Sequence, residues 1–328
     1  MANPTMSVIV VTETYSECLR WTLNCLSAQS IASELECILV TREGSGLDRV
    51  TSRVRGLHSH RVIEEETLDD AGKAKAKGVW AATAPLVAFV EDHSYPDPLW
   101  AEALVKAYAR GSFAAVGPVV LNANPAGYAS WGCHLVYYGM YMQASSGERV
   151  RHLPGNQSSY RRAVLLEYGS RLPDMLQAEI ELHGELLASG RSLHQEAEAK
   201  VYHLSYSAVA PAVREYFLAS RVFAAERRRH WTLARRAVYA LGSPLLPVIR
   251  MKRVLGQAWR AGLPLRVVLG SAWPAWLILC AGAAGEALGY SLDPGHAKAA
   301  LMRFEREHAG LFTRSDLEGV PGRSKSFD

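Results

Sequence analysis

The chain has 328 residues, of which 49% are hydrophobic and 21% are charged, a composition typical of globular domains and not of a disordered protein. The formal net charge is only +4, but arginines crowd the last third, which favours an anionic membrane surface and predicts no nucleic-acid partner. The five cysteines form no CxxC pair, so we expect reduced cytosolic thiols without a disulfide framework or zinc site. The chain runs directly into a predicted strand, and we expect no secretory signal.

Short apolar runs alternate with helical patterns in the first ninety residues. The runs at 7–11, 35–40, 61–63 and 85–90 predict strands, and helices are predicted over 16–29 and 71–82. Strands separated by helices predict an α/β fold with a doubly wound, mostly parallel sheet. In such a sheet the ligand site lies at the carboxyl ends of the strands.

The predicted strand at 85–90 ends abruptly in Glu91, Asp92 and His93. An apolar run of this kind is typical of a central parallel strand, so these side chains are expected at the ligand-binding edge of the sheet. Two carboxylates and an imidazole could hold a divalent cation against a phosphorylated ligand. The alternative is a polar turn before a helix that starts near Pro98.

Two common phosphate-binding signatures are absent from the sequence. No GxGxxG follows the first strand and no GxxxxGK[ST] occurs, which disfavours a Rossmann dehydrogenase and a P-loop NTPase. Other short motifs occur in this order: Thr12-Glu13-Thr14, Arg42-Glu43-Gly44-Ser45, Ala74-Lys75-Ala76-Lys77-Gly78, Glu91-Asp92-His93, Gly155-Asn156-Gln157-Ser158-Ser159-Tyr160-Arg161-Arg162, Glu179-Ile180-Glu181-Leu182 and Val201-Tyr202-His203.

This order of motifs, over roughly residues 6–205, resembles the family-2 glycosyltransferases of GT-A fold. The resemblance implies an inverting sugar transfer from a nucleotide-diphosphate donor. It implies that Glu43 contacts the nucleoside base and that Lys75 neutralises the diphosphate as a point charge. The full donor-binding set that it implies is Thr12, Glu13, Arg42, Glu43, Lys75 and Asp92.

The resemblance also implies acceptor and catalytic residues. Gly155, Asn156, Tyr160 and Arg161 would lie beside the acceptor and the donor sugar, and the alternative is a loop that leads into a helix over 163–168. The catalytic base would be Glu179, with Glu181 as the alternate. Because the two glutamates are two positions apart, they face different sides of a helix.

The family carries an Asp-x-Asp metal motif where this chain has Glu91-Asp92-His93. The resemblance implies Mg²⁺ or Mn²⁺ bound by Glu91 and His93, with His203 completing a metal or diphosphate site. The altered residues at these motifs leave a second hypothesis open, a catalytically degenerate GT-A protein that serves as a binding or scaffold subunit. A nucleotidyltransferase is a weaker third hypothesis, because that class usually begins with a Gly-rich loop.

The composition changes after His203. We expect a catalytic domain over 1–205, a basic and apolar helical region over 206–313 that associates with membranes, and a polar, disordered tail over 314–328. The apolar segment between Arg236 and Arg250 is too short to cross a bilayer, and its prolines favour an interfacial or re-entrant arrangement.

The segment 267–285 has no charged residue and is just long enough for a tilted membrane crossing. The alternatives are a helical hairpin buried against the catalytic domain and a hairpin embedded in the membrane, because Pro274, Gly282 and Gly285 weaken a single helix. We expect the protein at the cytoplasmic face of the cell membrane, acting on a lipid-linked or cell-envelope glycan acceptor.

Overall fold

The computed structural model describes residues 3–47, 55–144, 150–312 and 316–317. The chain divides into two compact units. The first contains the residues up to Leu121 and those from Tyr141 to His203, and the second contains 122–140 and 204–320. The predicted division at residue 205 assigns the segment 122–140 to the first domain, whereas in the structure this segment belongs to the second unit. Most of the predicted polar tail lies outside the described residues.

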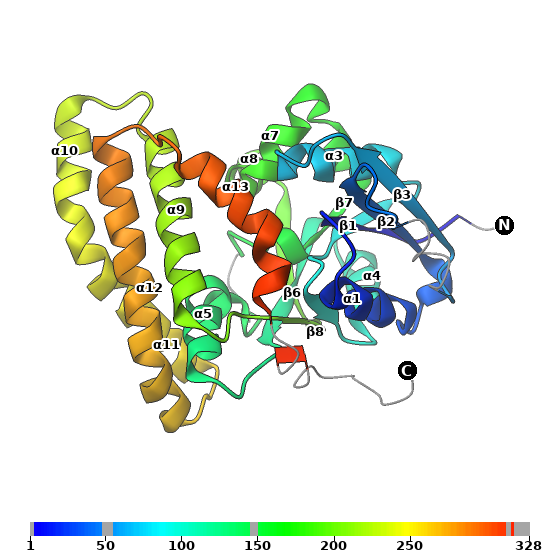
Figure 1. Ribbon diagram of the computed structural model, residues 1–328. Coiled ribbons are helices and arrows are strands. Elements are labelled where there is room, and N and C mark those ends of the chain that lie inside the picture. Colours follow the sequence, from blue (N-terminus) through cyan, green and yellow to red (C-terminus); the bar gives the residue numbers. More distant parts are fainter. Residues whose placement is uncertain (1–2, 48–54, 145–149, 313–315, 318–328) are drawn as a thin grey trace. The chain divides into compact units, whose positions relative to one another are not determined.

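The first unit is built on one eight-stranded sheet (Figure 1). Its strands are β1 (Met6–Thr12), β2 (Leu35–Arg42), β3 (Ser59–Glu65), β4 (Leu86–Phe89), β5 (Ser94–Pro96), β6 (Phe113–Asn122), β7 (Ser159–Arg161) and β8 (Ser192–His203).

The strands follow the order β3-β2-β1-β4-β7-β6-β8-β5. β1 pairs in parallel with β2 and β4, and β2 pairs in parallel with β3. β7 pairs antiparallel with both β4 and β6, and β5 pairs antiparallel with β8. The α/β fold class is therefore confirmed, with a parallel half from β3 to β4 that carries the predicted strands.

Helices cover both faces of this sheet (Figure 1). They are α1 (Glu17–Ser27), α3 (Ala71–Ala81), α4 (Trp100–Arg110), α6 (Arg162–Leu166), α7 (Leu172–Gln177) and α8 (Glu179–Ala188). Single 3₁₀ turns lie at Ala32–Glu34, Gly139–Tyr141, Gly155–Gln157 and Gly169–Arg171.

The core follows the two-residue period of the strands. Ile9, Ile38 and Val40 share a buried cluster with residues of α3, α6, α7 and α8. Val8 and Leu39, which alternate with them, are also fully buried and point to the other face of the sheet. Because both faces are buried, the central strands β1 and β4 are almost entirely apolar, whereas the edge strand β3 is only partly buried and carries several polar residues.

The second unit is helical. It contains α5 (Tyr128–Tyr138), α9 (Val209–Arg227), α10 (Leu233–Gly242), α11 (Leu246–Arg260), α12 (Leu265–Ser291) and α13 (Ala297–Glu307), with 3₁₀ turns at Ser243–Leu245 and His308–Leu311. The helix α12 packs against α5, α9, α10 and α11.

The segment 267–285 forms part of one continuous helix, so neither predicted hairpin is present. Pro274 lies inside α12 and packs against α5, where a Cβ on Gly132 would lie 2.6 Å from the Pro274 Cβ. The proline and glycines that weaken an isolated helix here permit close helix packing. Within the described residues, α12 alone is long and apolar enough to cross a membrane, with a mean hydropathy of 1.7.

Candidate functional site

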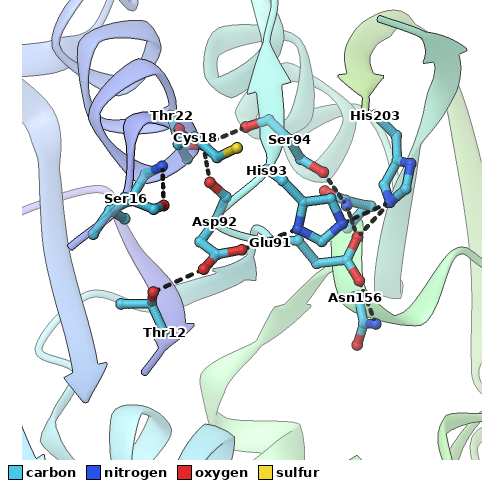
Figure 2. A network of polar contacts seen from close by, with 12 residues as sticks. Thr12, Ser16, Cys18, Thr22, Glu91, Asp92, His93, Ser94, Asn156 and His203 are labelled. Atoms are coloured by element: carbon cyan, nitrogen blue, oxygen red, sulfur yellow. Dashed lines mark hydrogen bonds and ion pairs between the residues drawn. The ribbon is translucent and has the colours of Figure 1, made fainter. Parts of the chain in front are cut away.

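The loop between β4 and β5 brings three potential metal ligands together. Glu91 and His93 follow β4, and His203 ends β8. The side-chain ligand atoms of these three residues all lie within 4.8 Å of one another. Figure 2 shows the two imidazoles and the carboxylate pointing toward a common point. We call these residues the Glu-His-His cluster.

The spacing of the ligand atoms fits one shared cation. Nε2 of His203 lies 3.1 Å from Nε2 of His93 and 3.2 Å from Oε2 of Glu91. Ligand atoms at about 2.1 Å from a metal, at right angles to each other, are about 3.0 Å apart. The donor set and these two separations are therefore compatible with a divalent metal ion bound by the Glu-His-His cluster.

Asp92 orients the His93 imidazole. Nδ1 of His93 lies 3.0 Å from Oδ1 of Asp92. Because a carboxylate can only accept, Nδ1 carries a hydrogen and donates a hydrogen bond to Asp92. In the neutral imidazole, Nε2 then presents its lone pair toward the cluster, as in the carboxylate–histidine pairs of metal sites. The second oxygen of Asp92 accepts a hydrogen bond of 2.7 Å from the Thr12 hydroxyl at the end of β1.

The backbone of the loop is held by α1. The hydroxyl of Thr22 lies 3.0 Å from the carbonyl oxygens of both Asp92 and Ser94. α1 itself begins at the cap residue Ser16, whose hydroxyl accepts a hydrogen bond from the backbone N–H of Leu19. The first helix of the sequence therefore fixes the position of the Asp92 carboxylate through the backbone.

Two amides hold Glu91 from the opposite side. Nδ2 of Asn156 donates to Oε1 of Glu91 at 2.7 Å, and Nε2 of Gln157 donates to Oε2 at 2.6 Å. Gln157 is fully buried, and its Nε2 also lies 2.6 Å from the Ser94 hydroxyl. The 3₁₀ turn Gly155–Gln157 thus aims both oxygens of the Glu91 carboxylate.

The electrostatics of the cluster favour ionised Glu91. Burial by itself raises the pKa of this carboxyl, but its hydrogen bond with His203 and the positive charges that His203 and His93 carry when they are protonated outweigh burial. With the added hydrogen bond from Asn156, the pKa of Glu91 lies well below its usual range. An ionised carboxylate is the form that a metal ion requires.

Asn156 connects the cluster to a second group of charges. Its Oδ1 accepts a hydrogen bond of 2.5 Å from Nζ of Lys75, and the same Nζ lies 2.5 Å from Oε1 of Glu179. Lys75 lies on α3 and is almost fully buried, and Glu179 is the first residue of α8. One polar network therefore runs from Thr12 through the cluster to Glu179.

Gly155 leaves room for the Glu179 carboxylate. A Cβ at position 155 would lie 2.0 Å from Oε2 and 2.8 Å from Oε1 of Glu179. Any other residue would displace this carboxylate. The predicted turn glycine and the predicted base are thus direct neighbours.

The structure does not bring every predicted residue into this network. Arg42 and Glu43 are exposed at the end of β2, and Glu13 is half-buried after β1, where its carbonyl accepts a hydrogen bond from Thr41. Glu181 is exposed on α8, two positions from Glu179, as the helical spacing predicted.

Tyr160 and Arg161 point away from the network. The Tyr160 hydroxyl is fully buried and lies 2.9 Å from Nε2 of His183. The Arg161 guanidinium donates to the Phe113 carbonyl oxygen at 2.9 Å and lies over the Tyr108 ring. Both side chains therefore support the sheet where we had expected contact with the acceptor.

The sequence motifs predict no site role for Gln157, Ser94 or Thr22. Gln157 directly follows Asn156 in the motif, so its position beside a predicted site residue was the available signal. Ser94 directly follows His93. Thr22 lies in the middle of a helix more than 60 residues before the loop that it holds, and no local pattern indicates that contact.

Comparison with known proteins identifies the sheet domain. Residues 7–169 match the family model for glycosyl transferase family 2. Residues 1–349 of S. aureus TarS, solved with UDP, align with a TM-score of 0.50 and 16% identity over 84% of this chain and 90% of that chain. This likeness shows a shared fold.

GalNAc-T7, solved with UDP, GalNAc and Mn²⁺, aligns with a TM-score of 0.48 and 16% identity. The alignment covers 61% of this chain and 43% of GalNAc-T7, so the present chain spans less than half of that protein. No curated protein matches the sequence significantly.

Proposed function

Through residues 7–169 the chain belongs to glycosyltransferase family 2, and we propose that it transfers a sugar from a nucleotide-diphosphate donor anchored at the Glu-His-His cluster. The observation that carries this proposal is the convergence of Glu91, His93 and His203 at the carboxyl end of β4. This is the edge of the sheet at which open α/β proteins bind their ligands.

Departure of a nucleoside diphosphate builds negative charge that must be neutralised. A divalent cation in the cluster would supply that positive charge. The chain's own contribution is to fix the ligands, because Asp92 orients His93 and the amides of Asn156 and Gln157 orient Glu91. Two imidazoles and one carboxylate favour a transition-metal ion such as Mn²⁺ over Mg²⁺, which prefers oxygen ligands.

Glu179 is the proposed general base for the acceptor hydroxyl. Its carboxyl group lies 2.5 Å from the Lys75 ammonium and close against Gly155, and these two contacts hold the side chain in place. A base in this position serves an attack from the face opposite the leaving diphosphate, and such an attack inverts the anomeric carbon. Lys75 has a second role in this proposal, as a positive charge that can turn toward the diphosphate when donor binds.

We take UDP as the donor nucleotide to test first, because the TarS structure of the same fold was solved with UDP. The proposed acceptor is a lipid-linked or cell-envelope glycan at the cytoplasmic face of the membrane. The support for that location is the second unit, which combines basic helices with the long apolar helix α12.

A scaffold protein without transfer activity is the second candidate. The observation that favours it is the engagement of Lys75 by both Glu179 and Asn156, which occupies the cation expected at the diphosphate. A scaffold of this kind would bind nucleotide without turning it over.

The two candidates differ in one experiment. Purified protein with Mn²⁺, a panel of nucleotide sugars and a bacterial lipid extract is assayed for release of nucleoside diphosphate. We expect Glu179→Gln to lower the rate by about 10²–10⁴-fold with donor affinity unchanged, because the change removes proton acceptance at constant shape. The matched control Glu181→Gln alters an exposed carboxylate of the same helix and should leave the rate unchanged. Nucleotide binding with no turnover of any donor supports the scaffold.

A further inference from the structure

The outer face of α12 is an apolar stripe. Most of its large exposed apolar side chains lie three, four or eleven residues from another one, and these spacings place them on one side of the helix. Leu265 and Leu269 are 62% and 65% exposed. From the first to the last member the stripe is about 35 Å long, at 1.5 Å per residue. We call these residues the α12 stripe: Leu265, Leu269, Trp273, Trp276, Leu277 and Leu288.

The inner face of α12 packs closely on α9. A Cβ on Gly285 would lie 2.3 Å from the Phe217 carbonyl oxygen, and one on Gly289 would lie 2.4 Å from that of Arg221. The two backbones are therefore in near contact over this stretch. α9 carries five charged side chains, Arg214, Glu215, Arg221, Glu226 and Arg227.

This packing argues against a membrane crossing by α12. If α12 crossed a bilayer with α9 attached, ionised side chains of α9 would enter the hydrocarbon, which is costly. The buried Glu286 of α12 also forms an ion pair of 2.5 Å with Arg250 of α11, so α11 would have to follow. The helix is thus a core helix of the second unit with one apolar face left open.

The helices beside the stripe carry positive charge. Residues 233–260, which form α10 and α11, include six arginines and lysines and no acidic residue. They also expose large apolar side chains, among them Leu241 and Trp259. Figure 1 shows α10, α11 and α12 as neighbouring helices, and α12 packs against both of the others.

We propose that α10, α11 and the α12 stripe form a peripheral docking surface for an anionic lipid bilayer. The proposal deepens the membrane location given under the proposed function. An apolar stripe rimmed by basic residues matches the acyl boundary and the anionic headgroups of such a bilayer. The tryptophans suit this depth because the indole ring is apolar and its N–H is polar. The arginine and lysine stems lie along the apolar surface with their charges at the headgroups.

The test is flotation of the full chain with vesicles of phosphatidylcholine, with and without 30% phosphatidylglycerol. We expect flotation with the anionic vesicles and at least tenfold weaker binding to the neutral ones. Sodium carbonate at high pH should release the protein, and retention would contradict peripheral docking. Absence of binding to both kinds of vesicle would overturn the proposal.

Variants locate the surface. The double variant Leu269→Glu and Trp273→Glu should weaken binding at least tenfold, whereas Trp80→Glu, at an exposed tryptophan of the first unit, should leave it unchanged. On α11, Lys252→Gln and Arg260→Gln should each weaken binding about fivefold, with Lys106→Gln in the first unit as the control. Unchanged binding in the double variant would refute the proposal.

Two further readouts separate competing explanations. If the double variant converts a dimer to a monomer and still floats like wild type, the stripe is a contact with a second copy and the proposal is wrong. Glu179→Gln should float like wild type, so that failure of docking and failure of the proposed transfer chemistry are distinguished.

Discussion

The two ends of the polar network in the sheet domain hold their carboxylates in different ways. Glu91 receives two amide N–H groups and a histidine, all of which aim its oxygens toward the other members of the Glu-His-His cluster. Glu179 is held by the ammonium group of Lys75, a cation that belongs to the chain. The first arrangement suits an added cation, whereas the second is already compensated.

This difference separates binding from proton transfer. At the Glu-His-His cluster, the side chains provide ligand atoms, and their contribution to catalysis depends on a cation bound between them. At Glu179, the contact with Lys75 holds the carboxyl group in place before any substrate arrives. Asn156 contacts both ends, because its Nδ2 donates to Glu91 and its Oδ1 accepts from Lys75.

The largest expected effect comes from breaking the cluster. His203→Ala should lower the Mn²⁺-dependent transfer rate by about 10³-fold, because charge stabilisation by a metal ion contributes several kcal/mol. Steady-state rates with saturating Mn²⁺ measure the effect. His194→Ala, in the same strand β8 but outside the cluster, is the matched control. A His203→Ala rate within a few-fold of wild type would contradict a metal role for this residue.

Cutting the connection should have a smaller effect. Asn156→Ala removes the hydrogen bonds that orient Glu91 and Lys75, and groups that orient metal ligands typically contribute 10–100-fold. We expect transfer to fall by about that factor, together with a weaker apparent affinity for Mn²⁺. A rate loss with unchanged Mn²⁺ affinity would show that Asn156 serves only the Lys75 end.

Breaking the Lys75 end should lower stability. Lys75→Met leaves the half-buried Glu179 carboxylate without its ammonium partner, and we expect a loss of about 2 kcal/mol, less than for a fully buried pair. Urea unfolding measures it. The double variant Lys75→Met, Glu179→Gln should recover part of the loss, since no unpaired carboxylate remains. If the double variant were as unstable as the sum of both single changes, the pair would not be coupled.

His183, outside the polar network, is a buried histidine that stays neutral at pH 7, in contrast to the charged groups of that network. Burial, with a smaller contribution from His152, lowers its pKa to about 4. The unfolded chain takes up this proton near pH 6.5, so the stability contribution is present above that pH and is lost as pH falls toward 4.

Between pH 7 and pH 5.5 the expected loss is about 1 kcal/mol from this side chain. Comparison of thermal unfolding of wild type and His183→Gln at both pH values isolates it, because glutamine can still bond to the Tyr160 hydroxyl. An identical pH dependence for the two proteins would show that His183 does not titrate as described.

The sequence predicted the parallel half of the sheet well, because strands buried on both faces are continuous apolar runs. The runs at 7–11 and 85–90 became β1 and β4, and the acids after the second run mark the site. The antiparallel half was harder to predict. β5 and β7 have three residues each, too few for a periodic pattern, and their pairing depends on distant strands.

The candidate site was predictable only in part. The motif order placed Glu91, His93, His203, Asn156 and Glu179 near one another, and the structure brings them together in one network. The direction of a side chain is not a local property, however. Tyr160 alternates into the core because β7 pairs with β4 and β6, and this pairing turns its hydroxyl to His183.

The central claim is that the Glu-His-His cluster anchors a nucleoside diphosphate through a divalent cation. Calorimetric titration of UDP into the full chain, with Mn²⁺ and then with a chelator, tests it most directly. We predict that chelation weakens UDP binding to wild type at least tenfold and that His203→Ala binds UDP weakly in both conditions. Equal UDP affinity of the wild-type protein with and without Mn²⁺ would contradict the account.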